Sequence, residues 1–233
     1  MGSEHIVKSY EQELKHLQRL IARMGGLAEQ QLAQAIEAVE ERDSALAARI
    51  IAADREVDAL EAEVDAHVVN LLALRQPMAV DLREIVAALK IGAFIERIAD
   101  YAKNVAKRTI ELAQAPAVQP AWSVPRLGRY ALGMLKDVLD AYNGKDAAKA
   151  REVWARDGEL DDLYNSLFRE LLTYMMEDPR SIGVCTHLLF IAKNLERVGD
   201  HATNIAENVH FQVTGRTIGG ERPRGAAPEA AKS

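Results

Sequence analysis

Two segments of the chain, residues 91–106 and 191–206, are copies of one helix at an offset of 100 positions. Both contain an acid pair with the spacing Glu-x-x-x-Asp, which is Glu96/Asp100 in one copy and Glu196/Asp200 in the other. Side chains four residues apart lie one above the other on a helix, so each pair stacks two carboxylates that repel each other weakly. A bound cation would relieve this repulsion. The copied helix therefore predicts two similar halves, each with an acidic site.

The repeat extends towards the N-terminus at a slightly larger offset. Residues 54–60, Asp-Arg-Glu-Val-Asp-Ala-Leu, match residues 157–163, Asp-Gly-Glu-Leu-Asp-Asp-Leu, at an offset of 103. Further back, Arg42-Asp43 matches Lys145-Asp146. We interpret the whole chain as a tandem duplication.

Acid pairs with i,i+4 spacing occur six times in this chain of 35 Asp and Glu residues. A single pair of this kind is more typical of a solvated helix face than of a binding site. Four of the six pairs, however, occupy matching places in the two halves, and this agreement favours binding. The matched pairs are Asp54/Asp58, Glu96/Asp100, Asp157/Asp161 and Glu196/Asp200.

Composition and apolar spacing predict an all-α fold. Aromatic residues make up only 5% of the chain, and Ala, Leu, Glu, Arg and Gln fill long unbroken segments, which favours helix over strand. In the first half, apolar periodicity predicts helices over residues 4–41, 43–76 and 80–113. In the second half it predicts helices that end near Tyr142, Met176 and Val213, with a turn at Asn143-Gly144 and a break at Asp178-Pro179. We therefore expect two tandem pseudo-symmetric three-helix bundles, with six long helices in all.

Proline and glycine positions predict the domain boundaries. Three of the seven prolines fall within residues 115–125, which predicts a semi-rigid linker. We place the first bundle at residues 1–115, the linker at 116–125 and the second bundle at 126–213. Residues 214–233 are rich in Gly, Pro, Ala and Arg without apolar periodicity, so we predict a disordered tail and assign it no function.

Composition also excludes several classes of protein. The one cysteine, Cys185, excludes an internal disulfide and a thiolate cage for zinc. The sequence shows no signal-peptide pattern and no apolar run near the ~20 residues of a membrane span, so we expect a cytoplasmic protein without direct membrane insertion. A net charge of −6 argues against a nucleic-acid partner.

Antiparallel helices would bring the acid pairs of each half together. Carboxylate ligands suit hard cations such as Mg²⁺, Mn²⁺, Ca²⁺ or ferric iron, and four carboxylates can bridge more than one ion. The candidate metal ligands are Asp54, Asp58, Glu96 and Asp100 in the first half, with Asp157, Asp161, Glu196 and Asp200 in the second.

Other polar residues near the motifs have ordinary interpretations. For Asn104 and Asn204, one turn beyond each acid pair, a structural hydrogen bond is favoured over metal ligation. Arg97 and Arg197 are expected to form ion pairs between helices. We expect the histidines to be ordinary surface or core residues.

Two Glu-x-x-His pairs leave an enzyme as the alternative. Glu13-x-x-His16 and Glu207-x-x-His210 match the spacing found in di-iron carboxylate bundles, so a carboxylate-metal phosphatase or oxidase stays open. Both pairs lie outside the duplicated motifs. The sequence has no nucleophile elbow, Walker loop, Rossmann fingerprint or kinase motif. We therefore expect that the protein is not an enzyme.

Three segments resemble the PhoU family. They are Arg75-Gln-Pro, Glu96-Arg-Ile-Ala-Asp-Tyr-Ala and Leu195-Glu-Arg-Val-Gly-Asp-His-Ala-Thr-Asn-Ile-Ala. The resemblance covers about residues 4–213 and implies two pseudo-symmetric three-helix bundles. It also implies multinuclear clusters of iron, or of another hard cation such as Mn or Mg, on the eight acids named above.

The same resemblance implies a function in phosphate homeostasis. Proteins of this family keep the phosphate-starvation (Pho) two-component system silent when phosphate is abundant, and they restrain phosphate uptake. The implied partners are a PhoR-like sensor histidine kinase, the PstB-like ATPase of the phosphate ABC transporter, and a second copy of the chain in a homodimer.

Overall fold

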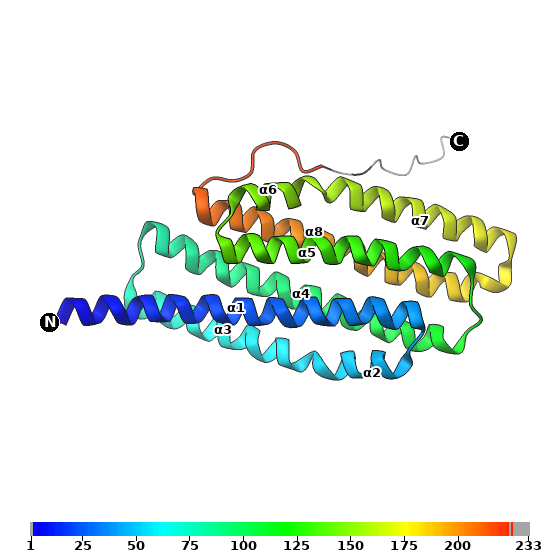
Figure 1. Ribbon diagram of the computed structural model, residues 1–233, viewed down its shortest axis with the longest axis horizontal. Coiled ribbons are helices and arrows are strands. Elements are labelled where there is room, and N and C mark those ends of the chain that lie inside the picture. Colours follow the sequence, from blue (N-terminus) through cyan, green and yellow to red (C-terminus); the bar gives the residue numbers. More distant parts are fainter. Residues whose placement is uncertain (1, 224, 226–233) are drawn as a thin grey trace.

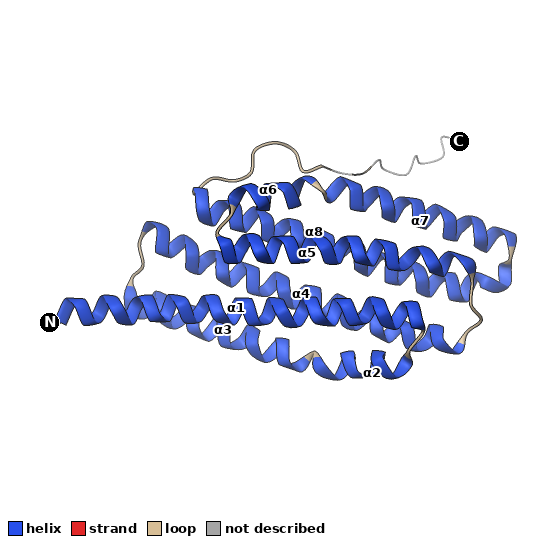
Figure 2. Ribbon diagram, in the orientation of Figure 1, coloured by secondary structure: helices blue, strands red, loops and turns tan. Residues whose placement is uncertain are grey.

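The computed structural model describes residues 2–223 and 225, apart from the side chains of residues 2–9 and 120. Within these residues every regular element is helical, as predicted (Figure 2). The first half contains α1 (Gly2–Glu41), α2 (Ser44–Ala53), α3 (Arg55–Arg75) and α4 (Ala79–Gln114). The second contains α5 (Val124–Gly144), α6 (Ala147–Ala155), α7 (Asp157–Glu177) and α8 (Ile182–Thr214), and two short 3₁₀ helices, η1 (Gln119–Ser123) and η2 (Pro179–Ser181), lie in the connections.

Six long helices are recognisable once the two broken ones are joined. α2 and α3 follow one another with a break at Asp54, and α6 and α7 follow one another with a break at Arg156. Figure 1 shows α1 to α4 grouped in the lower part of the view and α5 to α8 grouped above them. The predicted pair of three-helix bundles is confirmed.

The two halves begin their broken helices with the same cap. The side chain of Asp43 accepts hydrogen bonds from the backbone N–H groups of Ala45 and Leu46, and Asp146 does the same for Ala148 and Lys149. An Asp in this position satisfies backbone donors that a helix start leaves without partners. The repeat therefore fixes where α2 and α6 start.

The predicted turn at Asn143-Gly144 is wrong, because α5 continues through Gly144. The chain reverses one residue later, at Lys145, which is left-handed with φ 49°. Its counterpart Arg42 is left-handed as well, with φ 56°, and donates to the carbonyls of Leu112 and Ala115 at the end of α4. The position of this turn therefore follows the repeat, and not the preference of the Asn-Gly dipeptide for turns.

The connection between the halves also differs from a simple linker. Gln119–Ser123 form η1, and α5 already begins at Val124, with Pro125 in its first turn. Proline fits there because the first turn of a helix has no use for its missing N–H. The last two residues assigned to the linker, 124 and 125, therefore belong to the second bundle.

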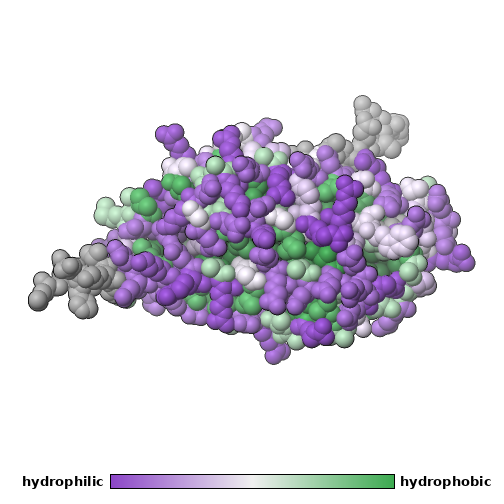
Figure 3. Space-filling model, in the orientation of Figure 1, coloured by the Kyte–Doolittle hydropathy of each residue, from purple (hydrophilic) through white to green (hydrophobic). Residues whose placement is uncertain are grey.

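The halves meet through α1, α4, α5 and α8, and α4 with α8 forms the most extensive contact. Between α1 and α5, an added Cβ on Gly25 would lie 2.7 Å from Leu139, and one on Gly128 would lie 2.7 Å from Ile36. These two contacts are copies of each other at the offset of 103. The surface in Figure 3 is mostly hydrophilic, with hydrophobic residues showing between the helices.

Candidate functional site

The first acidic site forms where the chain breaks between α2 and α3. Asp54 occupies the break, and its side chain is only 7% exposed. Its carboxylate accepts a hydrogen bond from Nζ of Lys103 on α4, which also donates to Oδ1 of Asp100 at 2.6 Å. Lys103 therefore joins the two aspartates and neutralises charge that would be costly to bury alone.

Further carboxylates crowd this site. Burial, reinforced by the charges of Asp100 and Glu61, raises the pKa of Glu96 to about 7. Burial and the charges of Asp65 and Asp58 also raise the pKa of Glu61. Neighbouring carboxylates contribute to both shifts, so a cation placed among them would be stabilised.

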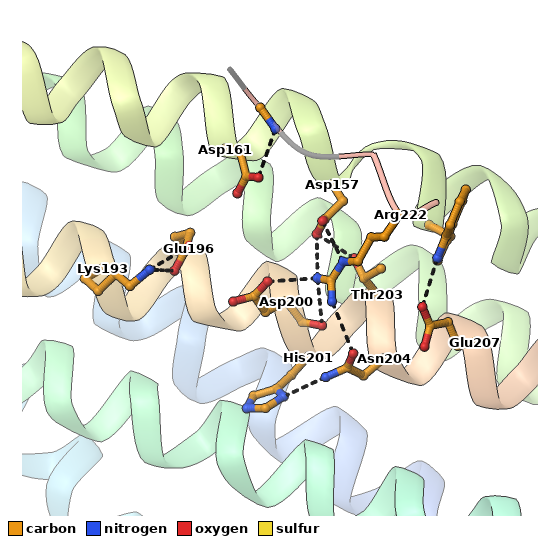
Figure 4. Close-up of polar contacts among 12 residues, drawn as sticks. Asp157, Asp161, Lys193, Glu196, Asp200, His201, Thr203, Asn204, Glu207 and Arg222 are labelled. Atoms are coloured by element: carbon orange, nitrogen blue, oxygen red, sulfur yellow. Dashed lines mark hydrogen bonds and ion pairs between the residues drawn. The ribbon is translucent and has the colours of Figure 1, made fainter. Parts of the chain in front are cut away.

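The second acidic site lies at the equivalent break, between α6 and α7 (Figure 4). Asp157 begins α7, and its side chain is 5% exposed. Thr203 on α8 donates to its Oδ1 at 2.9 Å. Arg222, from the segment after α8, donates to both oxygens of Asp157 at 2.7 and 2.8 Å and to Oδ1 of Asp200 at 2.8 Å. Arg222 thus plays the part in this site that Lys103 plays in the first.

The chain after α8 is held across the second site. α8 ends at Thr214 because Gly215 is left-handed, with φ 71°. Beyond Arg222, the N–H of Gly225 donates to Oδ2 of Asp161 at 3.0 Å (Figure 4). A Cβ on residue 225 would lie 2.5 Å from the Cβ of Asp161, so a glycine is required here.

These contacts change the interpretation of the C-terminal segment. The predicted disordered tail differs from the structure for residues 215–223 and 225, which the contacts of Arg222 and Gly225 hold against the second bundle. For residues 224 and 226–233 the prediction lies outside the described residues. The ion pairs of Arg222 explain the difference, since they fix a segment that has no apolar periodicity of its own.

The remaining acids of the second site have a second cation beside them. Nζ of Lys193 lies 2.7 Å from both carboxylate oxygens of Glu196. Burial raises the pKa of Glu196 and of Asp200, although Lys193 and Arg222 work in the opposite direction. The second site therefore contains two cations, Lys193 and Arg222, among its four acids.

The structure brings together only part of each predicted ligand set. Asp54 meets Asp100 through Lys103, and Asp157 meets Asp200 through Arg222, whereas Asp58 is exposed. Among the described residues, no three His, Cys, Asp or Glu side chains form a group that could hold a metal ion. The expected meeting of four carboxylates differs from this arrangement because a basic side chain stands between the helices in each site. Metal binding by the eight acids stays a prediction.

Sequence reasoning missed Lys103, Thr203, Arg222 and Glu61. A signal for the first three existed, because a buried aspartate repeated at 54 and 157 requires a cation in both halves. Lys103 supplies it in the first half, but its copy at the offset of 100 is Thr203, which has no charge. The second half therefore had to obtain its cation from another part of the chain.

The arginines of the duplicated motif behave differently from the expectation. Arg97 lies 3.9 Å from Glu96 and 3.8 Å from Asp100, which belong to its own helix, so the expected pairing between helices is wrong for this residue. Arg197 does reach the neighbouring helix, where its guanidinium lies 6.0 Å from the ring of Tyr101. Neither arginine therefore forms an ion pair that joins a carboxylate of one helix to another helix.

His201 and Asn204 have structural roles, as expected. The rings of Tyr101 and His201 stack at 5.4 Å between α4 and α8, and the Tyr101 hydroxyl lies 3.2 Å from Nε2 of His201. Burial, assisted by Arg97, lowers the pKa of His201 to about 4, so its ring is neutral at physiological pH. Asn204 accepts a hydrogen bond from Arg222 at 3.3 Å.

Both Glu-x-x-His pairs are engaged in contacts of the fold. Glu13 forms an ion pair with Arg75 at 2.7 Å, and His16 lies 3.6 Å from Glu63. At the other end of the chain, Trp154 donates to Glu207 at 3.0 Å, and Nδ1 of His210 lies 2.9 Å from the carbonyl of Arg216. The two pairs do not converge on a common site.

The fold and these sites define a class of protein, a helical protein built from tandem bundles with a repeated acidic motif. The PhoU domain family matches residues 21–109 and 124–209, one segment in each half. The chain belongs to the PhoU family.

Two relatives illustrate the similarity. The chain is 54% identical to the phosphate-specific transport system accessory protein PhoU homolog of Caulobacter vibrioides, covering 95% of this chain and 97% of that one. It is 37% identical to the phosphate-specific transport system accessory protein PhoU of Escherichia coli, covering 94% and 92%. Such coverage shows that the similarity extends over both halves.

Solved structures give the same result. The crystal structure of PhoU from Pseudomonas aeruginosa has a TM-score of 0.87 and 38% identity, covering 89% of this chain and 100% of that one. The structure of the phosphate transport system regulatory protein PhoU from Streptococcus pneumoniae has a TM-score of 0.83 and 27% identity, covering 90% and 99%.

No helix in the described part of the chain is both long and apolar enough to cross a membrane.

Proposed function

We propose that this protein is a negative regulator of the phosphate-starvation response and a modulator of phosphate uptake. In this proposal it acts in the cytoplasm as an adaptor between a PhoR-like sensor histidine kinase and the PstB-like ATPase of the phosphate transporter, as a homodimer. The observation that carries the proposal is the match to the PhoU family in both halves, with relatives that are named accessory proteins of phosphate transport.

A regulatory role without catalysis agrees with the chemistry of the sites. Lys103 and Arg222 are bonded to the aspartates that a catalytic metal would require, and both Glu-x-x-His pairs are engaged elsewhere. These contacts favour a scaffold over a carboxylate-metal phosphatase or oxidase.

The experiment that tests the regulatory role is a phosphatase reporter under Pho control in phosphate-rich medium. A strain that lacks the protein should show high reporter activity, and the wild-type chain expressed from a plasmid should restore low activity. Parental activity in the deletion strain would contradict the proposal.

Metal binding is a second, separable part of the proposal. We propose that a hard cation such as Mn²⁺ or ferric iron binds at the first site, because the charges of Asp100 and Glu61 help to raise the pKa of Glu96 there. These carboxylates do not form a ready-made ligand group, so the cation would have to draw them together. When bound, the cation would neutralise these carboxylates and hold α3 against α4. Metal analysis of the purified protein, with Glu96→Gln/Asp100→Asn as the comparison, tests this site, and equal metal content in both would contradict it.

A further inference from the structure

A cavity lies at the contact between α4 and α8, and two cations and one carboxylate are among its lining residues. It has a volume of about 400 Å³ and is lined by Asn104, Lys107, Arg108, Glu111, Phe190 and Asn194. We propose that this cavity binds an oxyanion of the phosphate class, and that Glu111 selects for an anion that carries a proton. This inference goes beyond the regulatory function proposed above and does not depend on the acidic sites.

Two cations, Lys107 and Arg108, line the cavity. The guanidinium of Arg108 lies 4.6 Å from the ring centroid of Phe190, which holds it against the cavity wall. Within the part of the chain that the structure describes, no ion pair joins Lys107 or Arg108 to a carboxylate. An arginine supplies a planar fork of donors for an oxyanion, and a neighbouring lysine adds a compact charge.

Two side-chain amides add neutral donors. Asn194 donates from Nδ2 to the carbonyl of Phe190 at 2.6 Å, which fixes the orientation of its amide and leaves its second N–H for a ligand. Asn104 lies across the cavity on α4, one turn before Arg108. Charged and neutral donors on both helices therefore surround one small polar volume.

Glu111 decides which anions fit. A carboxylate in an anion site repels the ligand unless the ligand donates a hydrogen bond to it. Inorganic phosphate carries at least one proton at neutral pH, whereas sulfate carries none. Glu111 can accept the P–O–H proton of phosphate and disfavours sulfate, so this residue makes the site selective.

The repeat supports a ligand role for the two cations. At the offset of 100, Lys107 and Arg108 correspond to Glu207 and Asn208. Both of these are engaged within the fold, since Trp154 donates to Glu207 at 3.0 Å and Asn208 donates to the carbonyl of Asn204 at 2.8 Å. These two helix positions thus make hydrogen bonds within the second half, whereas in the first half they line a cavity.

Isothermal titration calorimetry of the full chain with inorganic phosphate and with sulfate, at constant ionic strength, tests the proposal. Phosphate should bind and sulfate should bind far more weakly. Arg108→Gln should weaken phosphate binding by about tenfold or more, because it removes charge-assisted hydrogen bonds. Lys90→Gln is the matched control, since it removes one charge from an exposed position of the same helix, about 27 Å away at 1.5 Å per residue, and should leave binding unchanged.

Glu111→Gln is the decisive variant, because it should let sulfate bind nearly as well as phosphate. A parallel titration with O-phosphoserine separates free phosphate from a phosphorylated partner: its phosphate is mostly unprotonated at neutral pH, so it should bind more weakly than free phosphate, and equal or tighter binding would contradict the selection by Glu111. Thermal melting of each variant verifies folding. Equal binding of phosphate and sulfate by the wild type, no binding at millimolar phosphate, or wild-type affinity in Arg108→Gln would overturn the proposal.

Discussion

The two acidic sites descend from one repeat, yet different parts of the chain neutralise them. In the first site Lys103 belongs to the same helix as the Asp100 that it contacts. In the second site the copied position is Thr203, and the cation is Arg222, which lies beyond the end of α8. The comparison shows that a buried carboxylate needs a counterion in both halves, although different parts of the chain supply it. The cation of the first site belongs to the bundle itself, whereas the cation of the second site belongs to a segment that could leave the bundle.

The largest expected effect comes from removing the intrinsic cation. Lys103→Ala leaves Asp54 buried without its partner, and breaking such a pair costs about 3 kcal/mol of unfolding free energy. Urea unfolding measures this loss. Lys107→Ala is the control, because Lys107 is exposed and has no ion-pair partner among the described residues. A loss for Lys103→Ala no larger than for the control would mean that Asp54 does not depend on Lys103.

The next largest effect is a pH-dependent change in unfolding free energy, and it should differ between Glu96 and its copy Glu196. The pKa of Glu96 is about 7 in the folded protein and 4.5 in a model peptide, so folding favours its protonated form. That stabilisation is complete below about pH 4.5 and is lost as the pH rises through about 7. Glu96→Gln stays neutral, so in chelator-treated protein its stability relative to wild type should rise by about 2 kcal/mol between these limits.

The same substitution at the copied position should behave differently. Burial raises the pKa of Glu196 as well, but Lys193 at 2.7 Å opposes this shift, so Glu196→Gln should show a smaller gain at high pH than Glu96→Gln. Urea unfolding between about pH 5 and 8 measures both variants. A gain that does not depend on pH in Glu96→Gln would contradict the proposed protonation.

Removing the external cation should cost less than removing the intrinsic one. Arg222→Ala should lower the unfolding free energy by about 1–2 kcal/mol, because Thr203 still donates to Asp157 and water can replace the departing segment. The released segment should also be cleaved faster by a protease. Arg216→Ala, in the same segment, is the control for proteolysis, and equal cleavage of both variants would show that Arg222 does not hold the segment.

The smallest expected effect belongs to the uncharged partner of Asp157. Thr203→Val keeps the shape of the side chain and removes its hydrogen bond at 2.9 Å, which should cost about 1 kcal/mol in urea unfolding. In the double variant with Arg222→Ala the loss should exceed the sum of the single losses, since Asp157 then has neither donor. Strict additivity would show that the two donors act independently.

Local signals predicted the fold well. The match of Asp43 with Asp146 is visible in the sequence, and both residues cap helices in the structure. The turn at Asn143-Gly144 was mispredicted because the repeat register, with Arg42 and Lys145 both left-handed, overrides local preference. The acid pairs were found because they are repeated, which is a property of the sequence alone.

The repeated aspartates indicate that each half needs a counterion, but no sequence signal identifies which residue supplies it in the second half. Arg222 lies 65 residues from Asp157 along the chain, in a segment whose composition indicates disorder, and a single arginine has no periodicity to reveal it. Glu61 is visible in the sequence only as a member of one of the two acid pairs, Glu61/Asp65, that have no match in the other half. Contacts of this kind depend on how the helices are placed in three dimensions, and a sequence pattern records that placement only where it is repeated.

The reciprocal glycine contacts between α1 and α5 bear on how far the two halves of one chain can differ. Gly25 against Leu139 and Gly128 against Ile36 form a self-complementary interface of the kind that joins two identical subunits. In a symmetric dimer, each substitution would appear twice and both sites would have to change together. In a single chain the two copies of the repeat can differ, as Lys103 and Thr203 do, so one polypeptide contains two unequal sites.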